Sequence, residues 1–242
     1  LTLSSPNDGK GVFIKAYKDQ DELIRIIEIL ASGFPYKHLY LRHLFAFKQI
    51  PNQSIAYDLP EDLWILFCSR YRFEPDVGAV RQGLGISDSW RWYRHRSEVP
   101  IFSIGNNYCT LANGGGFSPF YRDLDLLIYW ANNGAHIKVT EGDIYGSWSR
   151  TVKNVSFYFQ KGISYPKRTD FLNAHLLPEK CIFTVEGLGF FPVGGVESIW
   201  INIGLMNSRL HQYLINSFCG QHKHVGYIKN LPSIPESSST SL

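Results

Sequence analysis

The chain has 242 residues, of which 44% are hydrophobic, and its 24 lysines and arginines against 21 aspartates and glutamates give a net charge of +3. This size allows a buried core in one domain, or in one domain with an appendage. The net charge is too small to indicate a polyanionic partner by itself, so the distribution of charge along the chain has to be considered.

The four cysteines are widely spaced and lie in apolar or strand-like runs, at Cys68, Cys109, Cys181 and Cys219. This spacing is typical of buried free thiols in a reducing cytoplasm, since small disulfide scaffolds have denser cysteines. The sequence contains neither a signal peptide nor an apolar run long enough for a membrane helix. We therefore predict a soluble cytoplasmic protein without a membrane partner. A start without methionine and the ending PESSSTSL suggest an excised piece with a flexible tail at residues 236–242.

The N-terminal third is predicted to be mainly helical after an irregular or strand-like lead-in to about residue 15. Residues 19–32 carry an apolar stripe at helical spacing behind an aspartate that can cap the helix. Residues 37–50 form a second helical stretch, and a third helix begins at Pro60, whose neighbours Glu61 and Asp62 suit a first turn. We assign residues 1–70 to a helical connector.

From about Phe73 the sequence becomes richer in glycine, aromatic residues and short β-branched runs separated by turn signals, which favours strands. Helices are predicted at 121–134 and from Asn207 onward, followed by an extended segment at 225–228. The predicted class is α+β, with a mixed or antiparallel β-rich domain over residues 71–235 and a C-terminal helix. The predicted strands lie at residues 99–105, 136–142, 154–160, 181–187 and 198–204.

No self-sufficient active site is evident. The glycines of residues 187–195 have the wrong spacing for a dinucleotide-binding loop. Cys219, His222 and His224 could supply metal ligands, but no partner pair stands near them, so we predict a buried cysteine and two solvent-facing histidines. The carboxylate pair Glu141 and Asp143 lacks a second element and is predicted to be a cap or a solvated face. We predict no catalytic, cofactor-binding or metal-binding residue.

Positive charge gathers in two segments that also carry many aromatic or polar side chains. The first, SWRWYRHR, contains Arg91, Arg94 and Arg96, and Arg81 precedes it. The second has no acidic residue from Ser147 to Thr169. Basic side chains neutralise phosphates, and guanidinium groups read guanine edges. Composition alone leaves a nucleic-acid site and a protein-docking surface open. The cations of the second segment are Arg150, Lys153, Lys161, Lys167 and Arg168.

Six motifs follow one another in a fixed order along the chain: IPNQSIAYDLPEDLWILF, VRQGLGISDSWRWYRHRSEVP, ANGGGFSPFYRDLDLLIYWANNGAHIKV, YFQKGISYPKRTDFLNAHLLPEKCIFTVEGLGFFPV, GLMNSRLHQYLINSF and VGYIKNLPSIP. Together they resemble one region of bacterial adenine-specific DNA methyltransferases, the large enzymes of BREX phage defence and of type IIG/IIL restriction-modification. The resemblance covers about residues 50–235 and falls after the catalytic domain, over the target recognition domain. The helix starting at Asn207 and the segment before Pro232 resemble the elements that close this domain.

The resemblance implies a non-catalytic DNA sequence-recognition fragment that binds double-stranded DNA. The parent enzyme would transfer a methyl group from S-adenosylmethionine to adenine with a catalytic domain outside this chain. Arg91, Arg94 and Arg96 are the candidate base readers. The alternative is a protein-interaction module docking on other subunits of the defence system, and residual hydrolase or nuclease activity is disfavoured by the missing motifs. The candidate backbone contacts are Arg150, Lys153, Lys161, Lys167, Arg168, Arg209 and, at the helix start, Asn207.

Overall fold

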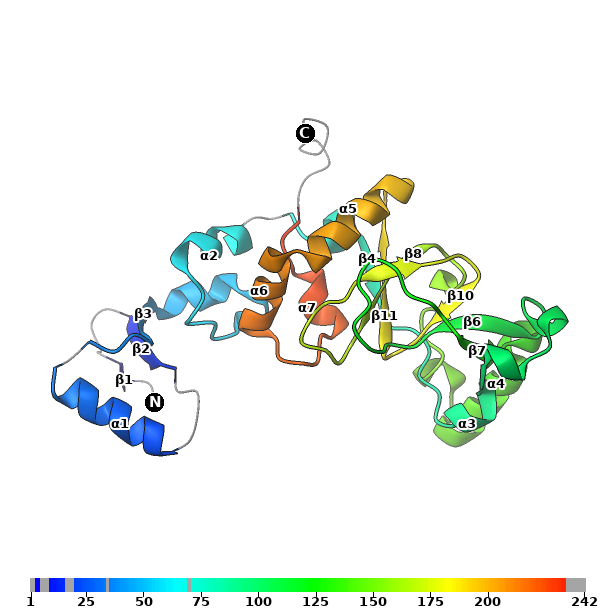
Figure 1. Ribbon diagram of the computed structural model, residues 1–242, viewed down its shortest axis with the longest axis horizontal. Helices are drawn as coiled ribbons and strands as arrows, with labels where there is room; N and C mark the ends of the chain where they lie inside the picture. The colour runs from blue at the N-terminus through cyan, green and yellow to red at the C-terminus, as the bar shows by residue number, and fades with distance from the viewer. Residues whose placement is uncertain (1–2, 5–8, 16–19, 34, 69–70, 234–242) are drawn as a thin grey trace. The chain divides into compact units, whose positions relative to one another are not determined.

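The computed structural model describes residues 3–4, 9–15, 20–33, 35–68 and 71–233 of the chain. The chain divides into two compact units, an N-terminal unit of residues 1–70 and a C-terminal unit of residues 71–242. Helices and mixed sheets alternate along it, which confirms the predicted α+β class (Figure 1). None of the helices in the described ranges is long and apolar enough to cross a membrane.

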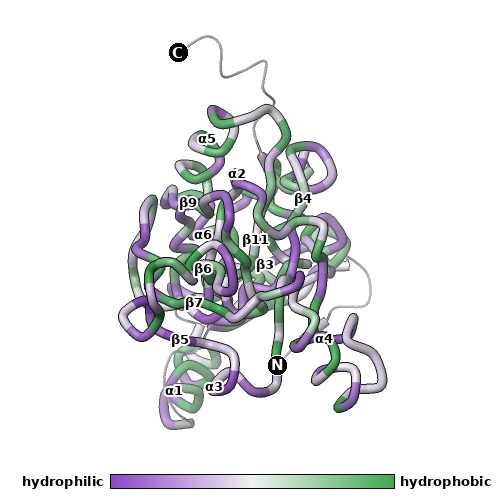
Figure 2. Tube along the Cα trace, turned by 90° about the vertical axis from the view of Figure 1, so that its right-hand side faces the viewer, coloured by the Kyte–Doolittle hydropathy of each residue, from purple (hydrophilic) through white to green (hydrophobic). Residues whose placement is uncertain are grey.

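The N-terminal unit contains a three-stranded antiparallel sheet with the order β1-β2-β3 and one long helix. The predicted helix is present as α1 (Gln20–Ala31), whose Ile26 is buried while Ile24 and Ile27 are exposed. In Figure 2 this helix carries both hydrophobic and hydrophilic stretches. The remaining elements are β1 (Leu3–Ser4), β2 (Lys10–Ile14), β3 (Leu39–His43), two 3₁₀ helices (Leu44–Gln49 and Pro51–Gln53) and α2 (Glu61–Cys68).

The prediction of a second helix at residues 37–50 is wrong. The first part of this stretch is strand β3, which pairs antiparallel with β2 so that Tyr40 lies opposite Phe13, and the second part is a 3₁₀ helix. Pairing with a strand distant in the sequence overrides local helix propensity here. The N-terminal unit is therefore mixed rather than purely helical.

The C-terminal unit is built on two four-stranded sheets. Their orders are β10-β6-β7-β5 and β4-β11-β8-β9, and within them only β10 and β6 run parallel. The strands of the first are β5 (Tyr93–His95), β6 (Tyr108–Ala112), β7 (Leu126–Tyr129) and β10 (Cys181–Phe183). Those of the second are β4 (Gly78–Arg81), β8 (Gly162–Pro166), β9 (His175–Leu177) and β11 (Gly187–Pro192).

Helices cover and connect these sheets. The C-terminal helices, orange to red in Figure 1, pack on the second sheet: α5 touches β8, β9 and β11, and α7 touches β4. A core of aromatic and aliphatic side chains, including Leu84, Leu111, Ile128, Ile137 and Phe183, joins strands of both sheets to α4. The helices are α3 (Ser89–Trp92), α4 (Ala131–Tyr145), α5 (Gly195–Asn207), α6 (Arg209–Phe218) and α7 (Val225–Lys229).

Several predicted elements of this unit differ from the structure. Residues 181–187 contain strand β10 as expected, but residues 136–142 and 198–204 lie in α4 and α5, and 3₁₀ turns occupy residues 101–103 and 155–157. The helix predicted at 121–134 contains strand β7, and the extended segment predicted at 225–228 is helix α7. The helix predicted from Asn207 is α6, capped by Ser208.

All four cysteines are free, as predicted, but not all are buried. Cys181 and Cys219 are buried, Cys109 is half-buried and Cys68 is exposed. Burial raises the pKa of the Cys181 thiol to about 12, so this sulfur stays protonated and behaves as an apolar core group.

Candidate functional site

The first basic segment forms helix α3 and strand β5, at the edge of the first sheet. Asp88 caps α3 by accepting a hydrogen bond from the Arg91 amide (3.1 Å), and the Arg91 guanidinium lies over the Trp92 ring, 4.7 Å from its centroid. Arg94 Nη1 donates to the carbonyl oxygens of Trp90 (2.9 Å) and Tyr93 (2.6 Å). Arg96 Nη2 lies 3.4 Å from the Thr110 hydroxyl. None of these three arginines pairs with a carboxylate in the described ranges.

A buried carboxylate in α4 holds the start of this segment. Glu141 Oε1 accepts hydrogen bonds from the Ser87 amide (3.0 Å) and hydroxyl (2.8 Å), and its other oxygen has no partner among the described residues. Glu141 is fully buried, so its prediction as a cap or a solvated side chain is wrong. Because Ser87 precedes the capping Asp88, Glu141 positions the loop that begins α3.

The second basic segment does not form one continuous patch. Arg150 and Lys153 lie in the loop after α4, which is tied to residues 84–85 by the Gly85 amide donating to the Thr151 carbonyl (2.8 Å). Lys161 precedes β8 and Lys167 follows it, which separates their backbones by roughly 20 Å along the strand. The acid-free run in the sequence is thus distributed over three places in the fold.

Lys167 and Arg168 share a carboxylate that the sequence did not indicate. Glu186 Oε1 lies 3.6 Å from Lys167 Nζ, and Glu186 Oε2 lies 3.2 Å from Arg168 Nε. His222 pairs with Arg168 across an isolated β-bridge. Burial, followed by the positive charge of Lys167, lowers the pKa of His224. We call Lys167, Arg168, His222 and His224, with Glu186 among them, the basic cluster.

The possible metal ligands near the end of α6 are Cys219, His222 and His224. Among the described residues no group of three or more His, Cys, Asp or Glu side chains could hold a metal ion. The Cys219 thiol donates to the His222 carbonyl (3.3 Å), and both His222 and His224 are exposed. This arrangement agrees with the predicted buried cysteine and solvent-facing histidines.

At the start of α6, Asn207 and Arg209 have different surroundings. Asn207 Nδ2 donates to the Ala174 carbonyl (2.8 Å), and Asn207 Oδ1 accepts from the Ala174 amide (2.8 Å). Its amide is thus used inside the fold rather than offered to an anion. Ser208 caps the helix by accepting from the His211 amide (3.2 Å), and Arg209 is exposed on the first turn.

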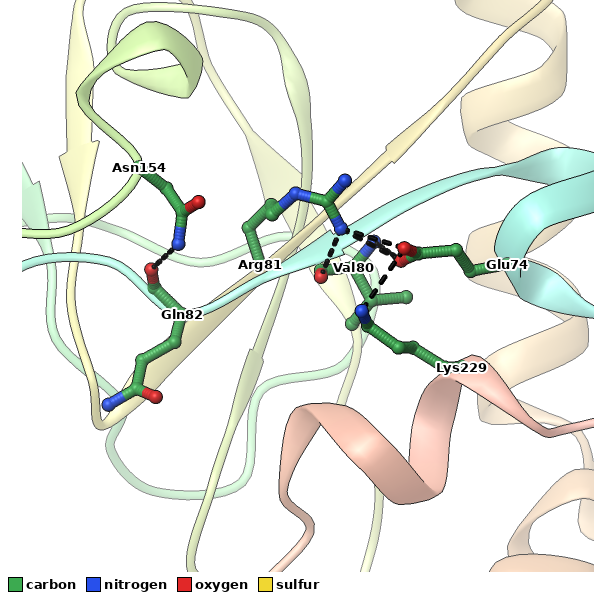
Figure 3. A network of polar contacts seen from close by, with 6 residues as sticks. All are labelled: Glu74, Val80, Arg81, Gln82, Asn154 and Lys229. Carbon is green, nitrogen blue, oxygen red and sulfur yellow. Dashed lines mark hydrogen bonds and ion pairs between the residues drawn. The ribbon is translucent and has the colours of Figure 1, made fainter. Parts of the chain in front are cut away.

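A further charged network, absent from the predicted site, surrounds Glu74 (Figure 3). Its carboxylate accepts from the Val80 amide (2.7 Å) and from Arg81 Nη1 (2.9 Å), and it pairs with Lys229 Nζ (3.1 Å). Burial alone would raise the pKa of Glu74, but the amide and the two cations outweigh it and hold the pKa below its ordinary value. An open cavity of about 310 Å³ adjoins this network.

Comparisons with known proteins find similarity in structure but none in sequence. No protein family and no curated protein sequence matches the chain. The solved structure of the type IIL restriction-modification enzyme MmeI in complex with DNA aligns with a TM-score of 0.48 and 11% sequence identity. The alignment covers 72% of this chain and 27% of the MmeI chain, so this chain spans about a quarter of the length of that protein.

Proposed function

We propose that this chain is the DNA sequence-recognition region of a bacterial adenine-specific DNA methyltransferase of the BREX or type IIG/IIL kind. The observation that carries the proposal is that most of the predicted cations lack a carboxylate partner. Of nine, two pair with Glu186, which leaves seven without an ion pair in the described part of the chain. Charges that the fold leaves without carboxylates remain available for phosphates. The seven are Arg91, Arg94, Arg96, Arg150, Lys153, Lys161 and Arg209.

Their placement supports a division between holding and reading DNA. Arg91 lies on α3, Arg94 on β5 and Arg96 on the 3₁₀ turn that follows β5. A guanidinium can donate to two acceptors on a guanine edge. The other cations lie on separate loops and helix starts and would fix register through phosphates. Cations on several separate loops suit a duplex, which presents a phosphate about every 3.4 Å along each strand.

The parent enzyme would supply the chemistry. S-adenosylmethionine would bind in a catalytic domain outside this chain, and methylation of adenine requires the base to leave the duplex. The residues of this chain would hold the surrounding DNA and select its sequence during that step. They would take no part in methyl transfer.

The test is DNA binding by a charge-removal variant, Lys167→Gln/Arg168→Gln, measured over a range of salt concentrations. We expect weaker binding and a salt slope smaller by up to about 2, because each phosphate contact contributes about 0.9. Lys37→Gln/Lys48→Gln in the N-terminal unit is the matched control and should leave the slope nearly unchanged. An unchanged slope in the first variant would remove Lys167 and Arg168 from the interface.

A second candidate function is supported by an apolar stripe on α5. Val196, Trp200 and Ile201 are exposed on this helix, beside exposed Val193, and such a stripe suits a protein partner. The chain would then dock on other subunits of a defence system. Pulldown of such subunits with and without duplex DNA separates the two functions, because docking through α5 does not need DNA.

A further inference from the structure

Two loops of the C-terminal unit lie side by side and carry four exposed aromatic side chains. Phe117, Phe120, Tyr121 and Phe171 are 72, 51, 67 and 55% exposed. The rings of Phe117 and Phe171 meet edge to face with centroids 5.8 Å apart. The loops are residues 113–125 and 167–174, and we call the four rings the aromatic platform. All the large apolar side chains that these loops expose are aromatic.

Phe120 occupies a backbone conformation that disfavours a bulky side chain. Its φ is +72°, in the left-handed region. Two hydrogen bonds hold it there: its amide donates to the Ala174 carbonyl (2.8 Å), and its carbonyl accepts from the Leu176 amide (3.1 Å). Strain of this kind persists only where the surroundings impose it, and it is concentrated at functional sites.

Three side-chain amides fix the irregular backbone beneath the platform. Asn173 accepts from the Ser118 amide (3.1 Å) and donates to the Gly116 carbonyl (3.0 Å), which joins the two loops. Gln212 of α6 accepts from the Leu172 amide (2.7 Å) and donates to the Asp170 carbonyl. Asn207 holds Ala174, as described above. The exposed rings therefore stand on a rigid support, which lowers the entropy cost of binding through them.

The charges beside the platform are of both signs. The 167–174 loop begins in the basic cluster, and exposed Arg168 lies three residues before Phe171. Arg122 is half-buried against Gly115, where a Cβ atom would lie 1.6 Å from its Nη2. Asp170 and Asp123 are exposed, and Asp123 accepts a hydrogen bond from the Tyr121 hydroxyl (2.9 Å). Cations at the base of the loop favour an anionic partner.

We propose that the aromatic platform is a stacking site for unpaired nucleobases of DNA, with the neighbouring basic cluster on the adjoining phosphates. The inference rests on the proposed function and adds to it a part in DNA distortion. Flat rings can take over the stacking that a base loses when its pair is broken, and this exchange is indifferent to base identity. Apolar side chains, phenylalanine among them, also insert between base steps of duplexes and partly unstack them. Aliphatic side chains of similar area would not provide such faces.

The experiment compares binding of the chain to a fully paired duplex and to the same duplex with a three-base mismatch bubble. We expect tighter binding to the bubble, by roughly five- to tenfold, which corresponds to about one stacked base. Phe117→Leu/Phe171→Leu retains apolar area but removes two rings, so the ratio of affinities should fall close to one. Phe102→Leu, another exposed phenylalanine outside the platform, should keep the wild-type ratio.

A second measurement reports stacking directly. 2-Aminopurine placed in the bubble should lose fluorescence on binding the wild type, because stacking on a ring quenches it, and should keep it with the double leucine variant. Circular dichroism establishes that the variant is folded, and Tyr121→Leu provides an independent substitution on the same platform.

The outcomes separate the two proposals. Tight binding to paired duplex without any preference for the bubble overturns the stacking site and leaves DNA recognition standing. A preference that survives the leucine variants overturns it as well and indicates apolar docking, as for a protein partner. Absence of binding to either DNA overturns both proposals.

Discussion

At the residue scale, Phe120 combines an exposed ring with a strained backbone, and glycine should relieve that strain. A left-handed conformation costs an L-residue other than glycine about 1–2 kcal/mol. We predict that Phe120→Gly unfolds with a free energy about 1 kcal/mol larger than Phe120→Ala, because alanine keeps the strain and loses the ring in the same way. Urea denaturation of the two variants checks this. Equal stabilities would mean that the left-handed conformation at residue 120 is not maintained.

Glu186 is the residue that limits the positive charge of the basic cluster. Its carboxylate pairs with both Lys167 and Arg168 and would lie beside any phosphate that these cations hold. Glu186→Gln should therefore tighten duplex binding by roughly two- to fivefold at low salt, with a smaller gain at high salt where charges are screened. Fluorescence anisotropy at two salt concentrations measures it. Weaker binding would show that Glu186 positions the two cations rather than competing with DNA.

At the element scale, the start of α6 carries Asn207, whose side-chain amide holds Ala174, and Arg209, which is exposed. Mutation of each residue separates its effect on stability from its effect on DNA binding. Asn207→Ala leaves the buried amide of Ala174 without its acceptor, while the Ala174 carbonyl keeps the Phe120 amide as a donor, and this should lower the free energy of unfolding by about 2 kcal/mol. Arg209→Gln should leave stability within about 0.5 kcal/mol of wild type and weaken DNA binding instead. Thermal melts and anisotropy on both variants distinguish them. A lower free energy of unfolding for Arg209→Gln would show that the Arg209 side chain stabilises the fold.

The same helix should make stability depend on pH. His211 Nε2 lies 2.9 Å from the Pro232 carbonyl and Nδ1 lies 3.1 Å from the Ser208 hydroxyl, which ties α6 to the following chain. Burial lowers the pKa of His211 below its ordinary 6.5, with the Pro232 carbonyl opposing the shift. The unfolded chain therefore binds the proton more readily, so this stability is complete above pH 6.5 and is lost as the pH falls through the folded pKa.

We predict that the free energy of unfolding decreases below pH 6.5 and that His211→Gln reduces the slope of this decrease. Buried His175, whose pKa burial also lowers, will account for part of the remaining slope. Exposed His222→Gln is the control and should retain the wild-type slope. Denaturation at several pH values between 5 and 8 provides the measurement, and a wild-type slope in His211→Gln would contradict the assignment.

Elements with strong local signals could be predicted from the sequence, and those decided by tertiary pairing could not. The apolar stripe of α1 predicts a helix, and the apolar run that contains β10 predicts a strand, and both are present. In α5 the run SIWINIG is β-branched enough to suggest a strand, yet Ile199, Asn202, Ile203 and Met206 are buried at helical spacing. Strand β3 shows the opposite error, since its residues suggest a helix but form a strand. Its partner β2 lies some thirty residues earlier, so the local sequence does not indicate the pairing.

At the scale of the whole molecule, chain distance hides most of the polar partners of the candidate site. The basic residues themselves could be named from the sequence, because the residue type alone gives the charge. Their neighbours could not. Glu186 contacts Lys167 through the pairing of β8 with β11. Glu74 contacts Lys229, and Ala174 contacts Asn207, because α7 and α5 pack on the second sheet. The single basic run therefore became three separate groups, one of them partly neutralised.

Selection from a randomised duplex pool tests most directly whether this chain reads DNA sequence. We predict that wild-type protein enriches a defined sequence, and that Arg94→Gln relaxes the preference at a small number of base pairs while the remaining positions stay selected. Lys153→Gln, a presumed phosphate contact, should weaken binding to all sequences alike. A pool that binds without enrichment, or that does not bind at all, would contradict DNA sequence recognition by this chain.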